Sequence, residues 1–149
     1  TVLFVIPNLV YTSFFLFLDR LPIGGGMPPG PKIISSQMER ARGKPLFISE
    51  FGGEALYGYH GSDTDANSWS EEYQAKLYRD NLRMFNNIPN LCGISAWALF
   101  DFRSPTRLQP TYQEGWNRKG LISDQGQRKQ AWHIIHDYYI KKAKQNKSK

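Results

Sequence analysis

The segment over residues 44–53, Lys-Pro-Leu-Phe-Ile-Ser-Glu-Phe-Gly-Gly, constrains the fold of this chain more than any other. Its short apolar run, Leu46–Ile48, is bounded by a proline and a glycine pair, which is typical of a buried strand that stops abruptly. The strand carries Glu50 near its end, and α/β barrels place catalytic groups at the carboxyl ends of their strands. Glu50 is therefore either a catalytic carboxylate or a strand-end residue that caps a neighbouring turn.

A helix and a second strand follow this segment. The stretch Ser68-Trp-Ser-Glu71 resembles a capping box and opens a helix that runs to about Asn86. Leu91–Phe102 is almost continuously apolar, as a strand buried on both faces should be. The apolar face of the helix recurs in steps of three and four residues, at Ala75, Tyr78, Leu82 and Phe85.

Two further helical patterns flank these elements. Residues 33–42 favour a short helix, and a last helix begins near Gln127. The order helix, strand, helix, strand, helix predicts an α/β fold with parallel strands and right-handed crossovers. An eight-fold α/β barrel needs roughly 250 residues, so a chain of 149 residues would hold only part of one. The stripe of the last helix comprises Ala131, Ile135 and Tyr138, with Trp132 and Tyr139 beside them.

Residues 1–32 differ in composition from the rest. Val2–Leu18 is strongly apolar, but it lacks an initiator methionine and a basic start, which argues against a signal peptide. Its length is at the lower edge for a membrane span, and Pro7 weakens that interpretation, so a membrane partner is not expected. A linker rich in glycine and proline follows at 21–32. We leave 1–32 unassigned, with a hydrophobic helix, a membrane anchor and foreign sequence as alternatives.

The net charge of +6 is concentrated at one end of the chain. Five lysines lie within 141–149, which we assign as a basic C-terminal tail, and 33–140 is the predicted domain. No basic–aromatic module accompanies these charges, so we expect no nucleic-acid partner.

The cysteine and histidine content indicates neither a disulfide nor a metal site. The single cysteine, Cys92, lies in an apolar run, where a buried free thiol is expected. The histidines His60, His133 and His136 lack the spacing of metal ligands. We therefore predict no metal site.

Four short motifs occur in one order along the chain: Phe-Ile-Ser-Glu-Phe-Gly (47–52), Trp-Ser-Glu-Glu-Tyr-Gln (69–74), Trp-Ala-Leu-Phe-Asp-Phe (97–102) and Asn-Arg-Lys-Gly (117–120). Together they resemble the C-terminal part of the catalytic barrel of family 2 glycoside hydrolases, and most closely that of the β-glucuronidases. The match covers about Lys44 to Tyr139. The resemblance implies the last two β/α units of a (β/α)8 TIM barrel, incomplete in this chain.

The resemblance implies that Glu50 is the nucleophile of a retaining β-glycosidase. Such an enzyme forms a covalent glycosyl intermediate and needs a second carboxyl roughly 5–5.5 Å away as acid/base. Because this mechanism needs only carboxylates, the resemblance implies neither a metal nor a cofactor. In the family this acid lies in an Asn-Glu pair on an earlier strand, and the sequence contains no such pair. Glu54 is better explained as a loop salt bridge or an exposed residue, and Asp101 as a structural hydrogen-bond acceptor.

The resemblance also implies a substrate-binding set. Trp97 matches a tryptophan that lies beside the sugar, although core packing is an alternative. Asn117 and Lys119 match the Asn-x-Lys motif that holds the carboxylate of glucuronic acid, where an ammonium and an amide are suitable partners. The alternative is that both lie exposed on a loop.

Two more residues complete the set. Arg107, or Arg103 in its place, is expected near the substrate carboxylate, although the spacing from Arg107 to Asn117 is longer than in the family. His60 is expected to organise a loop near the site rather than to act as a catalyst.

The predicted function is hydrolysis of a β-linked glycoside, most closely a β-glucuronide. Alternatives are a β-galactosidase-like hydrolase, a non-catalytic remnant with a carbohydrate-binding or interface role, and a small membrane-anchored protein. An incomplete barrel exposes strand edges and predicts self-association.

Overall fold

The computed structural model describes residues 2–6, 9–17, 45–65 and 68–147. The helix predicted at 33–42 and the linker at 21–32 lie outside the described residues. The elements in chain order are β1 (Val2–Ile6), β2 (Leu9–Phe17), β3 (Leu46–Gly52), α2 (Glu71–Phe85), β4 (Leu91–Ile94), β5 (Phe102–Arg103), β6 (Trp116–Asn117) and α3 (Gln130–Lys147).

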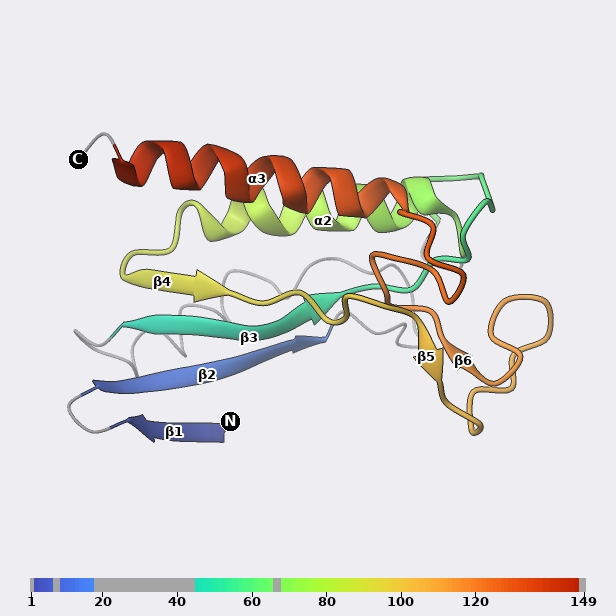
Figure 1. Cartoon of the computed structure of the whole chain (residues 1–149), viewed down its shortest axis with the longest axis horizontal. Coiled ribbons are helices and arrows are strands. Elements are labelled where there is room, and N and C mark those ends of the chain that lie inside the picture. The colour runs from blue at the N-terminus through green and yellow to red at the C-terminus, as the bar shows by residue number, and fades with distance from the viewer. Residues whose placement is uncertain (1, 7–8, 18–44, 66–67, 148–149) are drawn as a thin grey trace.

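The main sheet has four strands in the order β1-β2-β3-β4. Strands β2 and β4 both run parallel to β3, and β1 pairs antiparallel with β2. The parallel pairing predicted for β3 and β4 is confirmed. Figure 1 shows α2 and α3 side by side on one side of this sheet, with the small β5–β6 pair beyond one end of β3 and β4. The mixed α/β architecture follows from this two-layer arrangement.

The N-terminal apolar segment contributes strands. Residues 2–6 and 9–17 form a hairpin whose second strand pairs with β3, so the hydrophobic helix among our alternatives is wrong. The parallel ladder satisfies the backbone groups of 12–17 against 46–52. Within the part of the chain that the structure describes, no helix is both long enough and apolar enough to cross a membrane.

The core lies between β3 and the two helices. Phe51 is fully buried, and its ring meets Phe85 edge-on at 4.9 Å and Tyr78 at 5.3 Å. The predicted apolar face of α2 is therefore confirmed, and Ala131 and Ile135 are buried from α3. Burial of such side chains stabilises by about 1.5–3 kcal/mol each. The buried cluster comprises Ile48, Phe51, Tyr78, Leu82, Phe85, Leu121, Ala131 and Ile135.

The second strand is shorter than the sequence predicted. Strand β4 ends at Ile94, and the stretch up to Phe102 is neither one strand nor buried on both faces, since Leu99 and Phe100 are about half exposed. Up to Trp97 the backbone still donates to β3, from the Ser95 N–H to Ile48 O and from the Trp97 N–H to Phe51 O, and from Ala98 on it pairs with another segment. The Ala98 N–H donates to Lys119 O, and the Asp101 N–H donates to Ile122 O.

Two smaller predictions also need correction. Cys92 is exposed rather than buried, because β4 presents it outward, and its thiol donates to Leu46 O at 3.1 Å. The N-cap of α2 is Ser70, whose hydroxyl accepts from the Tyr73 N–H, rather than Ser68. The capping-box geometry is not adopted because the Glu71 carboxylate binds the Gly58 and Gln130 backbone N–H groups instead.

Candidate active site

Glu50 lies near the carboxyl end of β3, two residues before the strand ends at Gly52. Its side chain is half-buried, and the residue pairs with Phe15 of β2 in the sheet register. Burial raises the pKa of the Glu50 carboxyl, and the nearby Lys119 ammonium partly opposes this by lowering it. The site therefore holds a carboxylate near the end of a strand, with a lysine ammonium close enough for its charge to act on that carboxylate.

Trp97 reaches this end of the sheet from the segment after β4. Its backbone N–H donates to Phe51 O at 2.9 Å, and the following peptide bond to Ala98 is cis. Gly52 permits the approach, because a Cβ there would lie 2.7 Å from Trp97 O. The ring of Trp97 is 37% exposed and meets the ring of Phe102 edge-on at 6.1 Å. An indole with one accessible face is suited to stacking on a sugar ring.

Asn117 and Lys119 are both buried. The alternative interpretation of the sequence, in which both lie exposed on a loop, is therefore wrong. Asn117 lies in β6 opposite Phe102, and its Oδ1 accepts from the Lys119 N–H at 3.0 Å. Lys119 is only 2% exposed, and its charge acts on Glu50. The structure thus brings Glu50, Trp97, Asn117 and Lys119 to one end of the sheet.

Glu54 lies in a buried salt bridge, one of the two placements the sequence favoured for it. Arg107 Nη1 donates to its Oε1 at 2.7 Å, and Gln113 Nε2 donates to its Oε2 at 2.8 Å. Both carboxylate oxygens of Glu54 are therefore occupied, which disfavours an acid role. Arg107 is held by this contact, and Arg103 stacks over the ring of Trp116 at 5.1 Å.

His60 lies on the loop after β3 and contacts the first turn of α2. Its Nδ1 is 2.8 Å from Glu72 Oε1, and this hydrogen bond raises the pKa of the exposed imidazole. The Gly61 N–H and Gln130 Nε2 donate to the same carboxylate. Glu72 thereby ties the loop to the beginnings of α2 and α3, and His60 is part of that contact.

The loops beside the site meet in a junction that the sequence did not indicate. We call the segments Phe51–Ala55, Ala98–Asp101 and Asn117–Leu121, together with Lys129, the loop junction. Gly120 lies at its tightest point, because a Cβ there would be 2.2 Å from the Asp101 backbone N. The Gly120 N–H donates to Asp101 Oδ1 at 2.9 Å, which makes Asp101 the structural acceptor that the sequence predicted.

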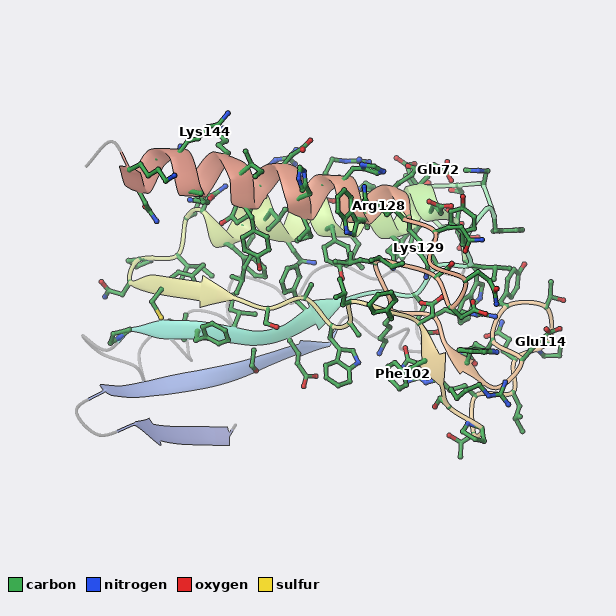
Figure 2. All side chains as sticks on the ribbon, in the orientation of Figure 1. Glu72, Phe102, Glu114, Arg128, Lys129 and Lys144 are labelled. Atoms are coloured by element: carbon green, nitrogen blue, oxygen red, sulfur yellow. The ribbon has the colours of Figure 1, made fainter. Side chains whose placement is uncertain are left out.

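Lys129 is the residue that the sequence analysis missed. Its side chain is fully buried, and its ammonium pairs with Asp101 at 2.8 Å. Figure 2 shows Lys129 just ahead of α3, toward the same end of the molecule as Phe102 and opposite Lys144. A lysine beside the start of a helix is typical of exposed surface, so no sequence pattern distinguished it.

Metal-binding groups do not gather in the described ranges, where no cluster of three or more histidine, cysteine, aspartate or glutamate residues could hold an ion. The polar groups at the site are instead a carboxylate, an ammonium and an amide. They suit a ligand that carries hydroxyl groups and a negative charge.

No family model matches this chain. It is 37% identical over 106 residues to a β-glucuronidase of Streptococcus agalactiae and 32% identical over 93 residues to one of Paenibacillus borealis. These alignments cover 66% and 62% of this chain, and it spans only 17% and 15% of the lengths of those relatives.

Solved structures share the fold. A family 2 β-galacturonidase from Eisenbergiella tayi bound to galacturonate superposes with a TM-score of 0.68 at 23% identity, over 91% of this chain and 24% of that chain. A β-glucuronidase of Faecalibacterium prausnitzii superposes with a TM-score of 0.64 at 20% identity, over 90% of this chain and 22% of that chain. The resemblance to part of family 2 glycoside hydrolases, and among them to β-glucuronidases, is thus confirmed.

Proposed function

We propose that this chain is part of a retaining β-glycosidase of family 2 that acts on β-glucuronides, with Glu50 as its nucleophile. The observation that carries this proposal is the placement of Glu50 at the carboxyl end of β3 with the Lys119 charge beside it. The relatives named β-glucuronidase support the substrate class. The parallel strands β2, β3 and β4 would be three neighbouring strands of a (β/α)8 barrel, with α2 and α3 in its outer ring.

In the proposed reaction, a carboxylate oxygen of Glu50 attacks the anomeric carbon of the sugar. The bond from that carbon to the leaving oxygen breaks, and a glycosyl ester on Glu50 forms. Water then hydrolyses this ester and releases the sugar with the same anomeric configuration. The sequence has no Asn-Glu pair, so we propose that the acid that protonates the leaving oxygen comes from outside these 149 residues.

Asn117 and Lys119 would set the preference for a uronic acid. Lys119 supplies a cation that pairs with the sugar carboxylate, and the Asn117 amide adds a hydrogen bond. A charge-assisted pair of this kind is worth roughly 1.5–3 kcal/mol, or about 10- to 150-fold in affinity. Trp97 would stack on the ring, and Arg107 and His60 would shape the surrounding loops.

The solved β-galacturonidase favours a second candidate substrate within the same class. Galacturonate and glucuronate carry the same carboxylate and differ in configuration at C4, so Asn117 and Lys119 alone would not distinguish them. Loss of catalysis with retained sugar binding would instead support the non-catalytic remnant.

Hydrolysis of 2,4-dinitrophenyl β-glycosides tests the proposal, because this leaving group departs without a general acid. We expect the purified chain to cleave the glucuronide faster than the galactoside, and the Glu50→Gln variant to lose at least about 1,000-fold in rate. The 2,4-dinitrophenyl β-galacturonide is measured as a third substrate, because galacturonate is the second candidate. Equal rates for the wild type and Glu50→Gln would exclude Glu50 as the nucleophile.

A further inference from the structure

Lys129 has all three of its ammonium donors occupied inside the protein. Its Nζ donates to Ala55 O at 2.6 Å, to Asp101 Oδ1 at 2.8 Å and to Arg118 O at 3.0 Å. The side chain is fully buried, and Asp101 is buried with it. The ammonium has no donor left for a ligand, so any role it has must be exerted through these three acceptors.

The three acceptors belong to the three segments of the loop junction. Ala55 follows the strand that carries Glu50, and Asp101 follows the segment that carries Trp97. Arg118 lies between Asn117 and Lys119, so a contact that fixes its carbonyl also fixes the position of the backbone of the Asn-x-Lys motif. The Ala55 N–H donates to the same Arg118 carbonyl at 3.1 Å. One carbonyl is thus fixed by two donors, one of which is charged.

A buried ammonium is costly as a source of stability alone. Removing a charge from water costs several kcal/mol, and apolar side chains of similar volume often replace a buried ion pair without loss of stability. The specific property of Lys129 is that it fixes three oxygen atoms at defined positions around one point. A side chain without directional donors would fill the same space but would not hold those oxygens.

We propose that Lys129 is a positioning residue for uronate recognition. It holds the Arg118 carbonyl against the segment after β3, and this sets Asn117 and Lys119 at a fixed position relative to Glu50. The inference rests on the proposed role of Asn117 and Lys119 in binding the carboxylate. Loss of Lys129 should therefore reduce the preference for a carboxylate more than the affinity for the sugar ring.

The test measures that preference by NMR titration of the ¹⁵N-labelled 149-residue chain. The ligands are methyl β-D-glucuronide and methyl β-D-glucoside, which share the ring and differ in the carboxylate. The variant is Lys129→Gln, which keeps two N–H donors and removes the charge. The matched control is Arg128→Gln, the same change at the exposed neighbouring cation that lies over the ring of Trp132 at 4.0 Å.

We expect the wild type and Arg128→Gln to bind the glucuronide at least about tenfold more tightly than the glucoside. In Lys129→Gln this ratio should fall at least fivefold, while the Kd for the glucoside changes less than twofold. A Lys129→Gln protein that keeps the ratio within twofold, while Lys119→Met loses it, would overturn the inference and leave the proposed function standing. A wild type without any preference would instead contradict the proposed function.

Hydrogen exchange decides the positioning role independently of ligand. The Ala55 and Lys119 amides should exchange at least tenfold faster in Lys129→Gln than in wild type, and Arg128→Gln should leave them unchanged. Unchanged exchange in Lys129→Gln would overturn the inference. Should that variant fail to fold, the wild type must still show a slowly exchanging ammonium signal for Lys129, and its absence would overturn the inference as well.

Discussion

The loop junction and the flank of α3 are held together by different interactions. In the loop junction, polar groups meet in fixed pairs, such as Lys129 with Asp101 and the Gly120 N–H with Asp101. Beside α3, a mostly apolar groove of about 390 Å³ lies against the end of β4. It is lined by Ile94, Ser95, Ala96, Leu99, Leu121, Trp132, Ile135, His136, Tyr139 and Ile140, and we call it the α3 groove.

The interactions of the two regions differ in whether they depend on direction. Hydrogen bonds and ion pairs in the loop junction specify where each segment lies, and a wrong partner there leaves a buried polar group unpaired. Apolar contacts along the α3 groove have no preferred direction and tolerate exchange of side chains. We therefore expect substitutions in the loop junction to reduce stability and alter the site, and polar substitutions at exposed residues of the α3 groove, such as Leu99, to change mainly solubility.

The largest effect is expected for Asp101→Asn. This change leaves the Lys129 ammonium buried beside a neutral amide, and breaking a buried ion pair costs about 3–5 kcal/mol. Urea denaturation should show a lower midpoint with an unchanged m-value. Asp137→Asn is the control, because its side chain is 82% exposed and should change stability by less than about 0.5 kcal/mol. Equal stability of both variants would show that the ion pair is not essential to the junction.

Lys119→Met should change the pH dependence of Glu50, the proposed nucleophile. Burial raises the pKa of Glu50 and the charge of Lys119 lowers it, so removing the ammonium should raise this pKa further. Because the nucleophile must be ionised, the acid limb of the reaction with an activated glucuronide should move to higher pH. The exposed Lys141→Met variant should keep the profile of the wild type. An unmoved limb in Lys119→Met would place Lys119 too far away to act on Glu50.

A smaller effect is expected for Glu72→Gln, at the contact between the loop and the two helices. Burial opposes ionisation of Glu72, but hydrogen bonds that include those from His60, Gln130 and Gly61 outweigh it and lower its pKa to about 2. A lowered pKa stabilises the folded chain at pH values above 4.5, the pKa of this group in the unfolded chain. This contribution is lost as the pH falls toward 2.

The stability of Glu72→Gln should therefore depend on pH in a defined way. Because the Glu72 side chain is 32% exposed, we expect a loss of about 1 kcal/mol at pH 7 that vanishes near pH 2. Unfolding free energies measured between pH 2 and pH 7 check this. A difference that stays constant over the whole range would assign the effect to packing rather than to charge.

The smallest change in stability is expected for Leu99→Ser at the α3 groove. Leu99 is 54% exposed, so its loss should cost less than about 0.5 kcal/mol. If the apolar surface of the α3 groove drives self-association, this variant should elute closer to monomer size in gel filtration than the wild type. A larger loss of stability would mean that the groove supports the fold of the single chain.

The parts of the fold that the sequence predicted are those with periodic patterns. The strand that carries Glu50 and the helix face of Ala75 and Tyr78 follow from local apolar spacing. Long-range pairing decided the rest. From Ala98 on, the backbone pairs with 119–122 instead of β3, and no periodicity encodes that exchange.

The candidate site divides in the same way. Glu50 and Trp97 belong to short motifs, as do Asn117 and Lys119, and these motifs could be recognised because four of them occur in one order along the chain. Lys129 could not be recognised, because its partners lie 11, 28 and 74 residues away in sequence. Its burial depends on three loops that meet only in the folded chain.

Covalent trapping of Glu50 tests the central claim most directly. A 2-deoxy-2-fluoro-β-D-glucuronyl fluoride loses fluoride when a carboxylate attacks its anomeric carbon, and the fluorine at C2 slows hydrolysis of the resulting ester. Fluoride departs without a strong general acid, so the test does not depend on the partner carboxyl. We predict a single adduct on the peptide that contains Glu50, detected by mass spectrometry, and none in Glu50→Gln. A folded chain that gives no adduct, or one on another residue, would contradict the assignment of Glu50 as the nucleophile.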